Sequence, residues 1–468
     1  MRRFTYSGKA VLLSALILVF YSLAGCSVVD MATEFGHING IVKDSVTKQP
    51  ISGVYVSTDY YNWNDDSDYD YTDSGGQYVL SLDSGTYDIH YRKDGYYDVT
   101  LTNITVISPF SQSRDIEMEP ADPEPTPTPT PSNSIRIFAS MAGDVDLFQA
   151  FYISKDNGTA VMDSSSPVGT GRSPAGISYF KSKARIIVAN SGDNTVSVYS
   201  SYTGYRPITG SPFAFDESDG QPYLTAYDET SGRVFISRKG SSSPGKIEVL
   251  DLSNPSYPTL AGLLGVNGLA DDPRTLRMDS QNRKLYIGSV NGSMITCYDT
   301  ASNSITGKIP ATSPVSFSLD VSGGRLFALK GNSNTISVID ISNPAAMQQI
   351  GETTVSTDSG VTVSDCEYAS GKNILFTAQK SGSSWYLGVW NTTTSPPYSQ
   401  AQSPLYLGSS EVTDIAYDPE TGFLYAVGSS SEGYGLRIYD CRNYPSGQIY
   451  EVSGSPFFPE SRYFMLGF

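Results

Sequence analysis

A repeat of 41 to 51 residues runs from residue 135 onward and restricts the possible folds more than any other feature of the chain. Each of its seven copies contains a short segment rich in apolar residues, and the last positions of these segments lie 49, 48, 51, 41, 49 and 49 residues apart. These apolar positions are Phe138, Ile187, Phe235, Tyr286, Phe327, Phe376 and Tyr425. Strand-forming repeats of this length indicate the blades of a β-propeller rather than a helical solenoid.

The spacing inside the repeat predicts several antiparallel strands in each copy. In four copies a proline lies 13 residues before the apolar position, where it begins a strand and its missing N–H group does no harm. These prolines are Pro174, Pro222, Pro273 and Pro314. An aspartate lies seven residues before the apolar position, in the expected hairpin turn, at Asp228, Asp279, Asp320 and Asp418. Each copy therefore reads as one blade.

The two ends of the repeat region complement each other. The first copy begins at Arg136, in what would be the second strand of a blade, so it lacks an inner strand. Residues 461–466 form a single strand with no partner after it. We expect this C-terminal strand to complete the first blade, because closing the ring removes free strand edges that promote aggregation.

The amino-acid sequence of the repeat resembles that of a known family. The segments VANSGDNTVSVY (188–199) and GNSNTISVID (331–340) are similar to YVTN-repeat propellers, which are related to the lactonase-type seven-bladed family. The resemblance covers residues 135–468 and implies a fold more than a function. WD40 propellers are the weaker alternative, because no Gly-His or Trp-Asp signature is present in residues 135–468.

A proline-rich segment separates the repeats from a smaller unit. Residues 120–134 read PADPEPTPTPTPSNS, which favours an extended linker. Residues 37–119 contain short alternating strands separated by turns, as in a small antiparallel sandwich. The motifs GIVKDSVTKQPISGVYV (40–56), TDSGGQYVLSL (72–82) and KDGYY (93–97) resemble a carboxypeptidase regulatory-like domain, which implies a non-catalytic unit. The sequence thus predicts an all-β chain: a β-sandwich over 37–119, then a seven-bladed β-propeller over 135–468.

The first residues resemble an export signal. Basic residues precede an apolar run over 10–23, which is shorter than the roughly 20 residues that span a bilayer as a helix. The motif LAGC (23–26) resembles the lipobox of bacterial lipoproteins. It implies a signal peptide over 1–25, lipidation of Cys26 and a tether over 26–36. Ser27 implies, by resemblance to Gram-negative sorting, a protein exported and lipid-anchored in the cell envelope, at the outer membrane.

The charge of the chain excludes one class of partner. The formal net charge is −17, and removal of residues 1–25 would take away three basic residues and leave the chain more acidic. Such a field repels nucleic acid, so no nucleic-acid partner is expected. The expected partners are the membrane, through the lipid anchor, and an envelope or extracellular protein, peptide or glycan.

Histidine and cysteine usage limits the chemistry. The two histidines, His37 and His90, both lie in the sandwich, which argues against a histidine-ligated metal or a Ser-His-Asp system in the propeller. A carboxylate–arginine site remains open. Cys297 and Cys366 align with apolar positions of the repeat and are expected to be buried, whereas Cys441 follows a strand end and is expected to be more exposed. No catalytic residue is assigned.

Two sets of polar residues are candidate ligands. Binding residues are expected near the starts of inner strands, where arginine paired with aspartate could hold a carboxylate or phosphate: Arg172, Tyr223, Asp271, Asp272, Arg274 and Arg462. Salt bridges between blades are the alternative for these residues. An acidic cluster in the sandwich is a weak candidate for calcium, the one cofactor considered: Asp65, Asp66, Asp68 and Asp70. The cluster lacks EF-hand spacing, so a solvated loop is the alternative.

Three functions are consistent with the sequence. The leading hypothesis is an envelope-anchored propeller that acts as a non-catalytic binding platform for a protein, peptide or glycan, because no catalytic group is assembled. The second is a hydrolase or lactonase of the propeller type. The third is a surface-layer scaffold component with no discrete ligand.

Overall fold

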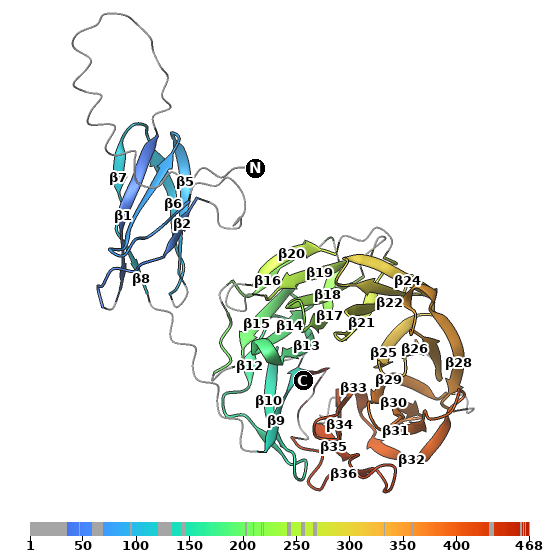
Figure 1. Ribbon diagram of the computed structural model, residues 1–468. Coiled ribbons are helices and arrows are strands. Elements are labelled where there is room, and N and C mark those ends of the chain that lie inside the picture. The colour runs from blue at the N-terminus through green and yellow to red at the C-terminus, as the bar shows by residue number, and fades with distance from the viewer. Residues whose placement is uncertain are drawn as a thin grey trace, which may run out of the picture. The chain divides into compact units, whose positions relative to one another are not determined.

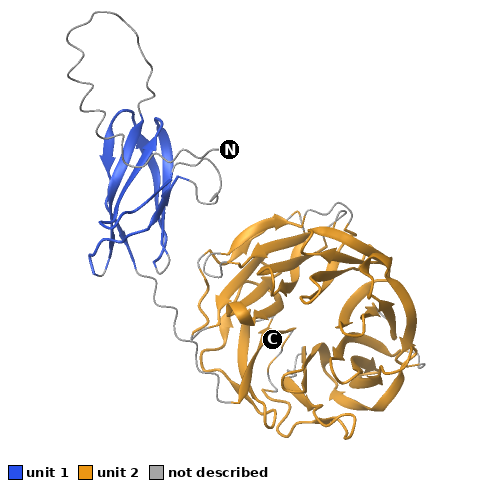
Figure 2. Cartoon of the chain, viewed as in Figure 1, with its two compact units in different colours: residues 1–124 blue, residues 125–468 orange. Residues whose placement is uncertain are grey.

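A computed structural model of the chain describes two compact units, residues 1–124 and 125–468, shown in Figure 2. The described part begins at residue 35. Within 35–468, the residues left undescribed are 46, 59–68, 94–95, 120–132, 142–145, 202–203, 209, 217, 219, 241–244, 254–257, 265–268, 332, 357–359, 430–434, 459–460, 462, 464 and 468. No helix in the described residues has the length and apolar character needed to cross a bilayer. The lipidation prediction at Cys26 lies outside the described residues.

The first unit is a β-sandwich of two sheets. One sheet has the order β4-β1-β7, with β8 also paired to β1, and the other has the order β3-β2-β5-β6. The strands are β1 (Gly36–Asp44), β2 (Tyr55–Ser57), β3 (Tyr69–Tyr71), β4 (Gln77–Leu82), β5 (Gly85–Arg92), β6 (Val99–Val106), β7 (Ser111–Ser113) and β8 (Ile116–Met118). Every second side chain of a strand points into the core of the sandwich. In β4, Tyr78, Leu80 and Leu82 are buried and the residues between them are exposed.

The second unit is a ring of seven sheets around a central channel (Figure 1). The first blade contains β9 (Ser134–Met141), β10 (Leu147–Ser154), β11 (Ala160–Met162), β12 (Val168–Gly169) and β37 (Met465–Gly467). The second contains β13 (Pro174–Phe180), β14 (Arg185–Asn190), β15 (Thr195–Ser200) and β16 (Phe213–Ala214), and the third β17 (Gln221–Asp228), β18 (Arg233–Lys239), β19 (Ile247–Asp251) and β20 (Thr259–Leu263).

The remaining four blades repeat this order. The fourth contains β21 (Pro273–Asp279), β22 (Lys284–Ser289), β23 (Met294–Asp299) and β24 (Ser304–Pro310), and the fifth β25 (Pro314–Asp320), β26 (Arg325–Lys330), β27 (Thr335–Asp340) and β28 (Gln348–Thr354). The sixth contains β29 (Thr362–Ala369), β30 (Ile374–Ser381), β31 (Ser384–Asn391) and β32 (Ser399–Gly408), and the seventh β33 (Glu411–Asp418), β34 (Phe423–Ser429), β35 (Leu436–Asp440) and β36 (Tyr450–Glu451). Two short 3-10 helices are η1 (Lys181–Lys183) and η3 (Pro344–Ala346).

Burial follows the position of each strand in its blade. The second strand packs against neighbouring blades on both faces, so all six residues of β14 are buried. The outer strand β20 is exposed along its whole length. The repeated aspartates close the hairpins between the first two strands: Asp228 accepts a hydrogen bond from the Thr230 backbone N–H at 3.0 Å. Such turns fix the register between the inner and second strands.

The ring closes between segments far apart in sequence. The C-terminal strand β37 pairs antiparallel with β9, with Leu466 opposite Ala139. Tyr463, just before β37, is fully buried, and its hydroxyl group bonds to the Gln149 side chain. The Thr413 hydroxyl of the seventh blade donates to the Tyr463 carbonyl oxygen at 3.0 Å. The last strand therefore joins the first and seventh blades.

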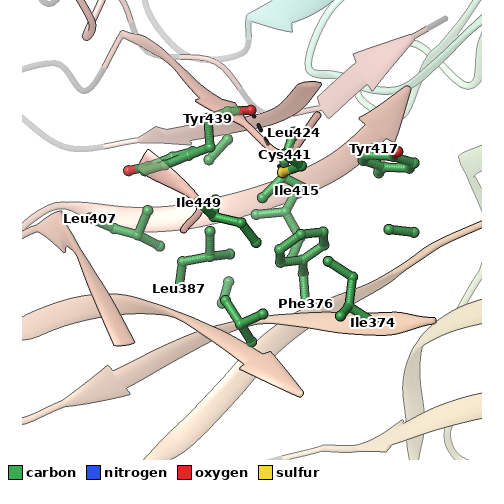
Figure 3. Close-up of a cluster of buried hydrophobic side chains, with 14 of the residues drawn as sticks. Ile374, Phe376, Leu387, Leu407, Ile415, Tyr417, Leu424, Tyr439, Cys441 and Ile449 are labelled. Atoms are coloured by element: carbon green, nitrogen blue, oxygen red, sulfur yellow. Dashed lines mark hydrogen bonds between the residues drawn. The ribbon is translucent and has the colours of Figure 1, made fainter. Parts of the chain in front are cut away.

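The three cysteines of the propeller are buried. Cys297 and Cys366 are fully buried, as expected from the repeat alignment. The expectation that Cys441 is more exposed is wrong: its exposed fraction is 0%. Figure 3 shows it in the apolar cluster between the sixth and seventh blades, together with Leu424 and Tyr439. The chain turns inward after β35, where the Cys441 N–H donates to the Gly422 carbonyl oxygen at 3.0 Å.

Candidate active site

The inner strands of the seven blades surround the channel in one common register. In every blade, one inner-strand residue pairs with the apolar position that defines the repeat. These seven residues, which we call the central layer, are Gly467, Ser178, Ala226, Arg277, Ser318, Glu367 and Ala416 in ring order. Five of them are glycine, alanine or serine, whose side chains fill little space. The two members of the central layer with ionisable side chains are Arg277 on β21 and Glu367 on β29.

A cavity of about 380 Å³ lies against the central layer. Its walls come from the inner strands of six blades. The lining residues are Gly176, Ile177, Ser178, Leu224, Thr225, Tyr227, Arg277, Glu367, Asp414, Ile415, Ala416, Met465, Leu466 and Gly467. Arg277 and Glu367 lie deep in the protein yet remain partly accessible, as expected for side chains that line an enclosed space. The cavity thus brings a guanidinium and two carboxyl groups together.

The Glu367 carboxyl group holds its proton more tightly than an ordinary glutamate. Burial raises its pKa from 4.5 to about 7, with Arg277 opposing the shift and Asp365 adding to it. The Ser318 hydroxyl on β25 donates a hydrogen bond to Glu367 Oε2 at 3.2 Å. A carboxyl group that titrates near neutral pH can take a proton from water and give it back, as a general base requires.

Arg277 supplies the positive charge of the cavity. Burial lowers its pKa, but the carboxyl groups around it, led by Glu367, outweigh that effect, so its pKa is raised and the guanidinium stays charged. One of its N–H groups, on Nη1, donates to the Leu276 carbonyl oxygen at 3.2 Å. A fixed cation in a cavity can stabilise negative charge that develops on a bound molecule.

Asp414, which lines the cavity, interacts with a further carboxyl group, that of Asp365. Asp365 Oδ1 accepts a hydrogen bond from the Ser316 hydroxyl at 2.5 Å, and Oδ2 accepts one from the Ile415 N–H at 2.9 Å. Asp414 Oδ2 accepts one from the Leu466 N–H at 2.8 Å. Burial raises the pKa of Asp414 well above its usual value, and the nearby Asp365 adds to this shift. Asp414 therefore holds its proton more tightly than an ordinary aspartate.

Three of the residues predicted to bind a ligand, Tyr223, Asp272 and Arg274, interact with one another. Asp272 is fully buried and accepts hydrogen bonds from the Gly240 N–H at 2.7 Å and from Arg274 Nε at 2.9 Å. Burial raises the pKa of Tyr223, and the charges of Arg274, Asp414 and Asp272 also act on it. Arg274 is therefore already paired with Asp272, and neither residue lines the cavity.

The other predicted ligand-binding residues do not join this group. Arg172 is exposed and forms an ion pair with Asp193 at 2.5 Å. The Asp271 carbonyl oxygen accepts a hydrogen bond from the Gly292 N–H at 3.2 Å. Arg462 lies outside the described residues. A ligand role for all six predicted residues stays a prediction.

Sequence reasoning did not single out Arg277, Asp365, Glu367 and Asp414. The repeat alignment carries a signal for two of them, because Arg277 and Glu367 both stand nine residues before the apolar position, where the second, third, fifth and seventh copies have serine or alanine. A charged residue at a position that is otherwise small has no packing role in the blade. Comparing each position across the copies would have identified both.

Of the four aspartates in the acidic cluster of the sandwich, the structure describes one, Asp70. Asp65, Asp66 and Asp68 lie outside the described residues. Asp70, on β3, accepts hydrogen bonds from the Tyr71 N–H at 2.8 Å and the Val79 N–H at 2.7 Å. Across the described part of the chain, no group of three or more histidine, cysteine, aspartate or glutamate side chains is arranged to hold a metal ion. The calcium site stays a prediction.

Comparison with protein families identifies the sandwich and part of the propeller. Residues 37–119 match the carboxypeptidase regulatory-like domain family. Residues 244–264 and 318–355 match the LVIVD repeat family. Among curated proteins, none matches the sequence significantly. The resemblance to YVTN repeats stays a prediction.

Solved structures share the propeller fold at low sequence identity. A protein from Lactobacillus plantarum has a TM-score of 0.58 at 14% identity, over 71% of this chain and 98% of that protein. A putative 6-phosphogluconolactonase from Bacteroides uniformis has a TM-score of 0.57 at 13% identity, over 72% and 99%. The periplasmic gluconolactonase of Pseudomonas aeruginosa has a TM-score of 0.51 at 12% identity, over 71% and 98%. At such identities the likeness shows the fold alone. The protein is all-β and joins a carboxypeptidase regulatory-like β-sandwich to a seven-bladed β-propeller.

Proposed function

We propose that the propeller is a hydrolase that opens a lactone ring in its central channel. The observation that carries the proposal is the cavity in which Arg277, Glu367 and Asp414 lie together. The arrangement suits ester hydrolysis, because it brings together a carboxyl group that can act as a base, a cation, and a second carboxyl group whose pKa is raised. The names of two solved structures with this fold, a putative phosphogluconolactonase and a gluconolactonase, support the same reaction class.

The reaction needs no group beyond these side chains and water. Glu367, as the carboxylate, takes a proton from a water molecule, whose oxygen forms a bond to the lactone carbonyl carbon. Arg277 stabilises the negative charge that develops on the carbonyl oxygen. The ring C–O bond then breaks, and Asp414 protonates the leaving oxygen. The product is an open hydroxy acid, and Asp414 regains its proton as Glu367 releases the one it accepted.

This proposal reverses the order of two hypotheses drawn from the sequence. The non-catalytic binding platform for a protein, peptide or glycan rested on the lack of an assembled catalytic group and of histidine in the propeller. The channel provides such a group from carboxylates and an arginine. Histidine is not required when a carboxyl group has a pKa of about 7, as Glu367 has.

A lactone panel tests the proposed reaction. The full mature chain is assayed against five- and six-membered sugar-acid lactones, with and without Ca²⁺, by the release of acid at pH 7.5. We expect turnover above the uncatalysed rate that does not depend on Ca²⁺. Inertness towards the whole panel would end the hydrolase proposal. A specific partner captured from envelope extracts would then favour the binding platform, and self-association on cells would favour the surface-layer scaffold.

We also propose that the protein is exported and held in the cell envelope by lipid on Cys26, with the outer membrane as its site. The support is the lipobox-like motif LAGC at 23–26. Three acyl chains would anchor the chain stably, since a single chain binds membranes only marginally.

Replacing Cys26 with alanine should abolish incorporation of labelled palmitate and shift the protein from the membrane fraction to the soluble fraction. The variant Ser27→Ala, which keeps the cysteine, should still be labelled. Palmitate labelling and fractionation by centrifugation measure both effects. Membrane retention of an unlabelled Cys26→Ala protein would contradict lipid anchoring.

A further inference from the structure

We infer that the substrate of the channel is an uncharged, hydroxyl-bearing lactone and that phosphorylated lactones are excluded. The inference rests on the proposed function, because it names the substrate class of the same cavity. The charge balance of the channel and the groups that line its walls carry it.

Among the described residues that line the cavity, one is a cation, Arg277, and two carry carboxyl groups. Among its lining residues, the charged side chains are Arg277, Glu367 and Asp414, and the Asp365 carboxyl group acts electrostatically on all three. With one guanidinium and three carboxyl groups, this cluster carries net positive charge only if all three carboxyl groups are protonated. The charge of Arg277 therefore already has carboxyl partners before any ligand enters.

Two described cations near the starts of the inner strands, Arg274 and Lys239, have partners of their own. Arg274 forms an ion pair with the buried Asp272, with Nη2 2.9 Å from Oδ2. Lys239 Nζ lies over the Tyr223 ring, 4.8 Å from its centroid, which is a cation–π contact at the starts of the inner strands rather than in the cavity. A single lysine at that place does not match a phosphate monoester, which carries about −1.5 to −2 charges at pH 7.

A phosphate group in the cavity would lose water without gaining a matched set of donors. Burying a charge is costly unless it is paired and hydrogen-bonded, and like charges brought together cost several kcal/mol. Proteins that bind phosphate use arginine pairs, helix N-termini or backbone N–H nests. The described lining residues come from strands and include one arginine.

The same walls suit the hydroxyl groups of an uncharged sugar lactone. The oxygens of Glu367 and Asp414 accept hydrogen bonds, while the Ser178 and Thr225 hydroxyls, 2.6 Å apart, can donate or accept. Ile177, Leu224 and Leu466 provide apolar contact for the C–H groups of the ring. Pockets that bind small molecules combine apolar walls with a few placed polar groups in this way.

The charge balance also favours product release. Hydrolysis turns an uncharged lactone into a carboxylate, and that carboxylate is formed in a cavity whose cluster holds one guanidinium and three carboxyl groups, including the Asp365 carboxyl group. Because like charges repel, the hydroxy acid should bind more weakly than the lactone from which it came. We therefore expect weak inhibition by the product acid.

The test compares matched lactones on the full mature chain at pH 7.5. D-glucono-1,5-lactone and its 6-phosphate differ only in the phosphate group, and we expect kcat/KM to be roughly a hundredfold higher for the uncharged lactone. Adding gluconate at the KM concentration of the lactone should inhibit by less than half. A preference for the phosphorylated lactone would overturn the inference and leave the hydrolase proposal standing.

A binding measurement separates failure of the inference from failure of the reaction. Calorimetry with the non-hydrolysable gluconolactam and with 6-phosphogluconate should show binding of the lactam and none of the phosphate. The variant Glu367→Leu should gain affinity for 6-phosphogluconate, because it removes one carboxyl group, while Lys239→Ala should leave lactam affinity unchanged. If neither lactone is turned over, the reaction fails, and tighter binding of 6-phosphogluconate than of the lactam would overturn the inference itself.

Discussion

Replacing Glu367 with glutamine is expected to lower kcat for lactone hydrolysis by about 10² to 10⁴-fold, the usual contribution of a general base. Glutamine has nearly the same shape and keeps the hydrogen bond from the Ser318 hydroxyl, but it cannot accept a proton from water. The KM should change little. Steady-state kinetics on the best lactone of the panel measures both constants.

The pH dependence of the wild-type protein tests the same assignment. A general base must be ionised, so kcat/KM should rise with pH through about 7, the pKa of Glu367. Folding stability should change in the opposite direction. Because burial raises this pKa above 4.5, the folded protein binds the proton more tightly than the unfolded chain, and stability from this group is lost as pH rises from 4.5 to about 7. Glu367→Gln should show neither transition.

A second buried glutamate provides the control. Glu248 lies on β19, the third strand of its blade, and burial raises its pKa as well. It does not line the cavity. Glu248→Gln should therefore keep the wild-type kcat and pH profile. Equal loss of activity in both variants would point to a general effect of buried charge and would contradict a specific role for Glu367.

Deleting residues 462–468 should abolish cooperative folding of the propeller. The deletion removes β37, exposes the inner edge of β9 and takes away Tyr463 and Leu466, whose exposed fractions are 0% and 7%. Loss of buried side chains of this size costs about 2–5 kcal/mol each, against a total stability of about 5–15 kcal/mol for a domain. Circular dichroism during heating and binding of a hydrophobic dye would report the effect.

Two point variants at Tyr463 should reduce the stability of the propeller by smaller amounts than the deletion. Tyr463→Phe removes only the hydroxyl bond to Gln149 and should cost about 1 kcal/mol in the free energy of unfolding. Tyr463→Ala also removes the ring that meets Phe151, with centroids 5.7 Å apart, and should cost about 3–5 kcal/mol. A truncated chain with the wild-type melting temperature would contradict the closing role of β37.

The fold could be predicted from the sequence because the same weak strand pattern recurs in every copy of the repeat. One apolar strand at Ile187 is ambiguous, but seven such strands at a regular spacing exclude a helical array. The hairpin aspartates and the strand-initial prolines add local signals of the same period, and β17, β21 and β25 end at Asp228, Asp279 and Asp320. The sandwich was accessible through a different route, the order of its motifs.

The candidate site was harder to predict from the sequence because it depends on which blades face one another. Arg277 and Glu367 are 90 positions apart in sequence and belong to the fourth and sixth blades, so no local motif contains both. The prediction placed ligand residues at the starts of inner strands, and none of Tyr223, Asp272 and Arg274 is among the residues that line the cavity, so their ligand role stays a prediction. Cys441 was misjudged for a related reason: the end of a strand was read as surface, whereas neighbouring blades cover it.

The central layer also makes the propeller a scaffold for redesign. Its positions share one strand pairing, and five carry residues no larger than serine. Ala416 is one of them that is only partly buried and lines the cavity, so it should tolerate new chemistry more readily than the buried second strands, where added volume causes strain. Exchanging Ala416 for small polar side chains should diversify ligand choice while the blades stay intact. Gene duplication with drift at these few positions would let one ring architecture evolve many specificities.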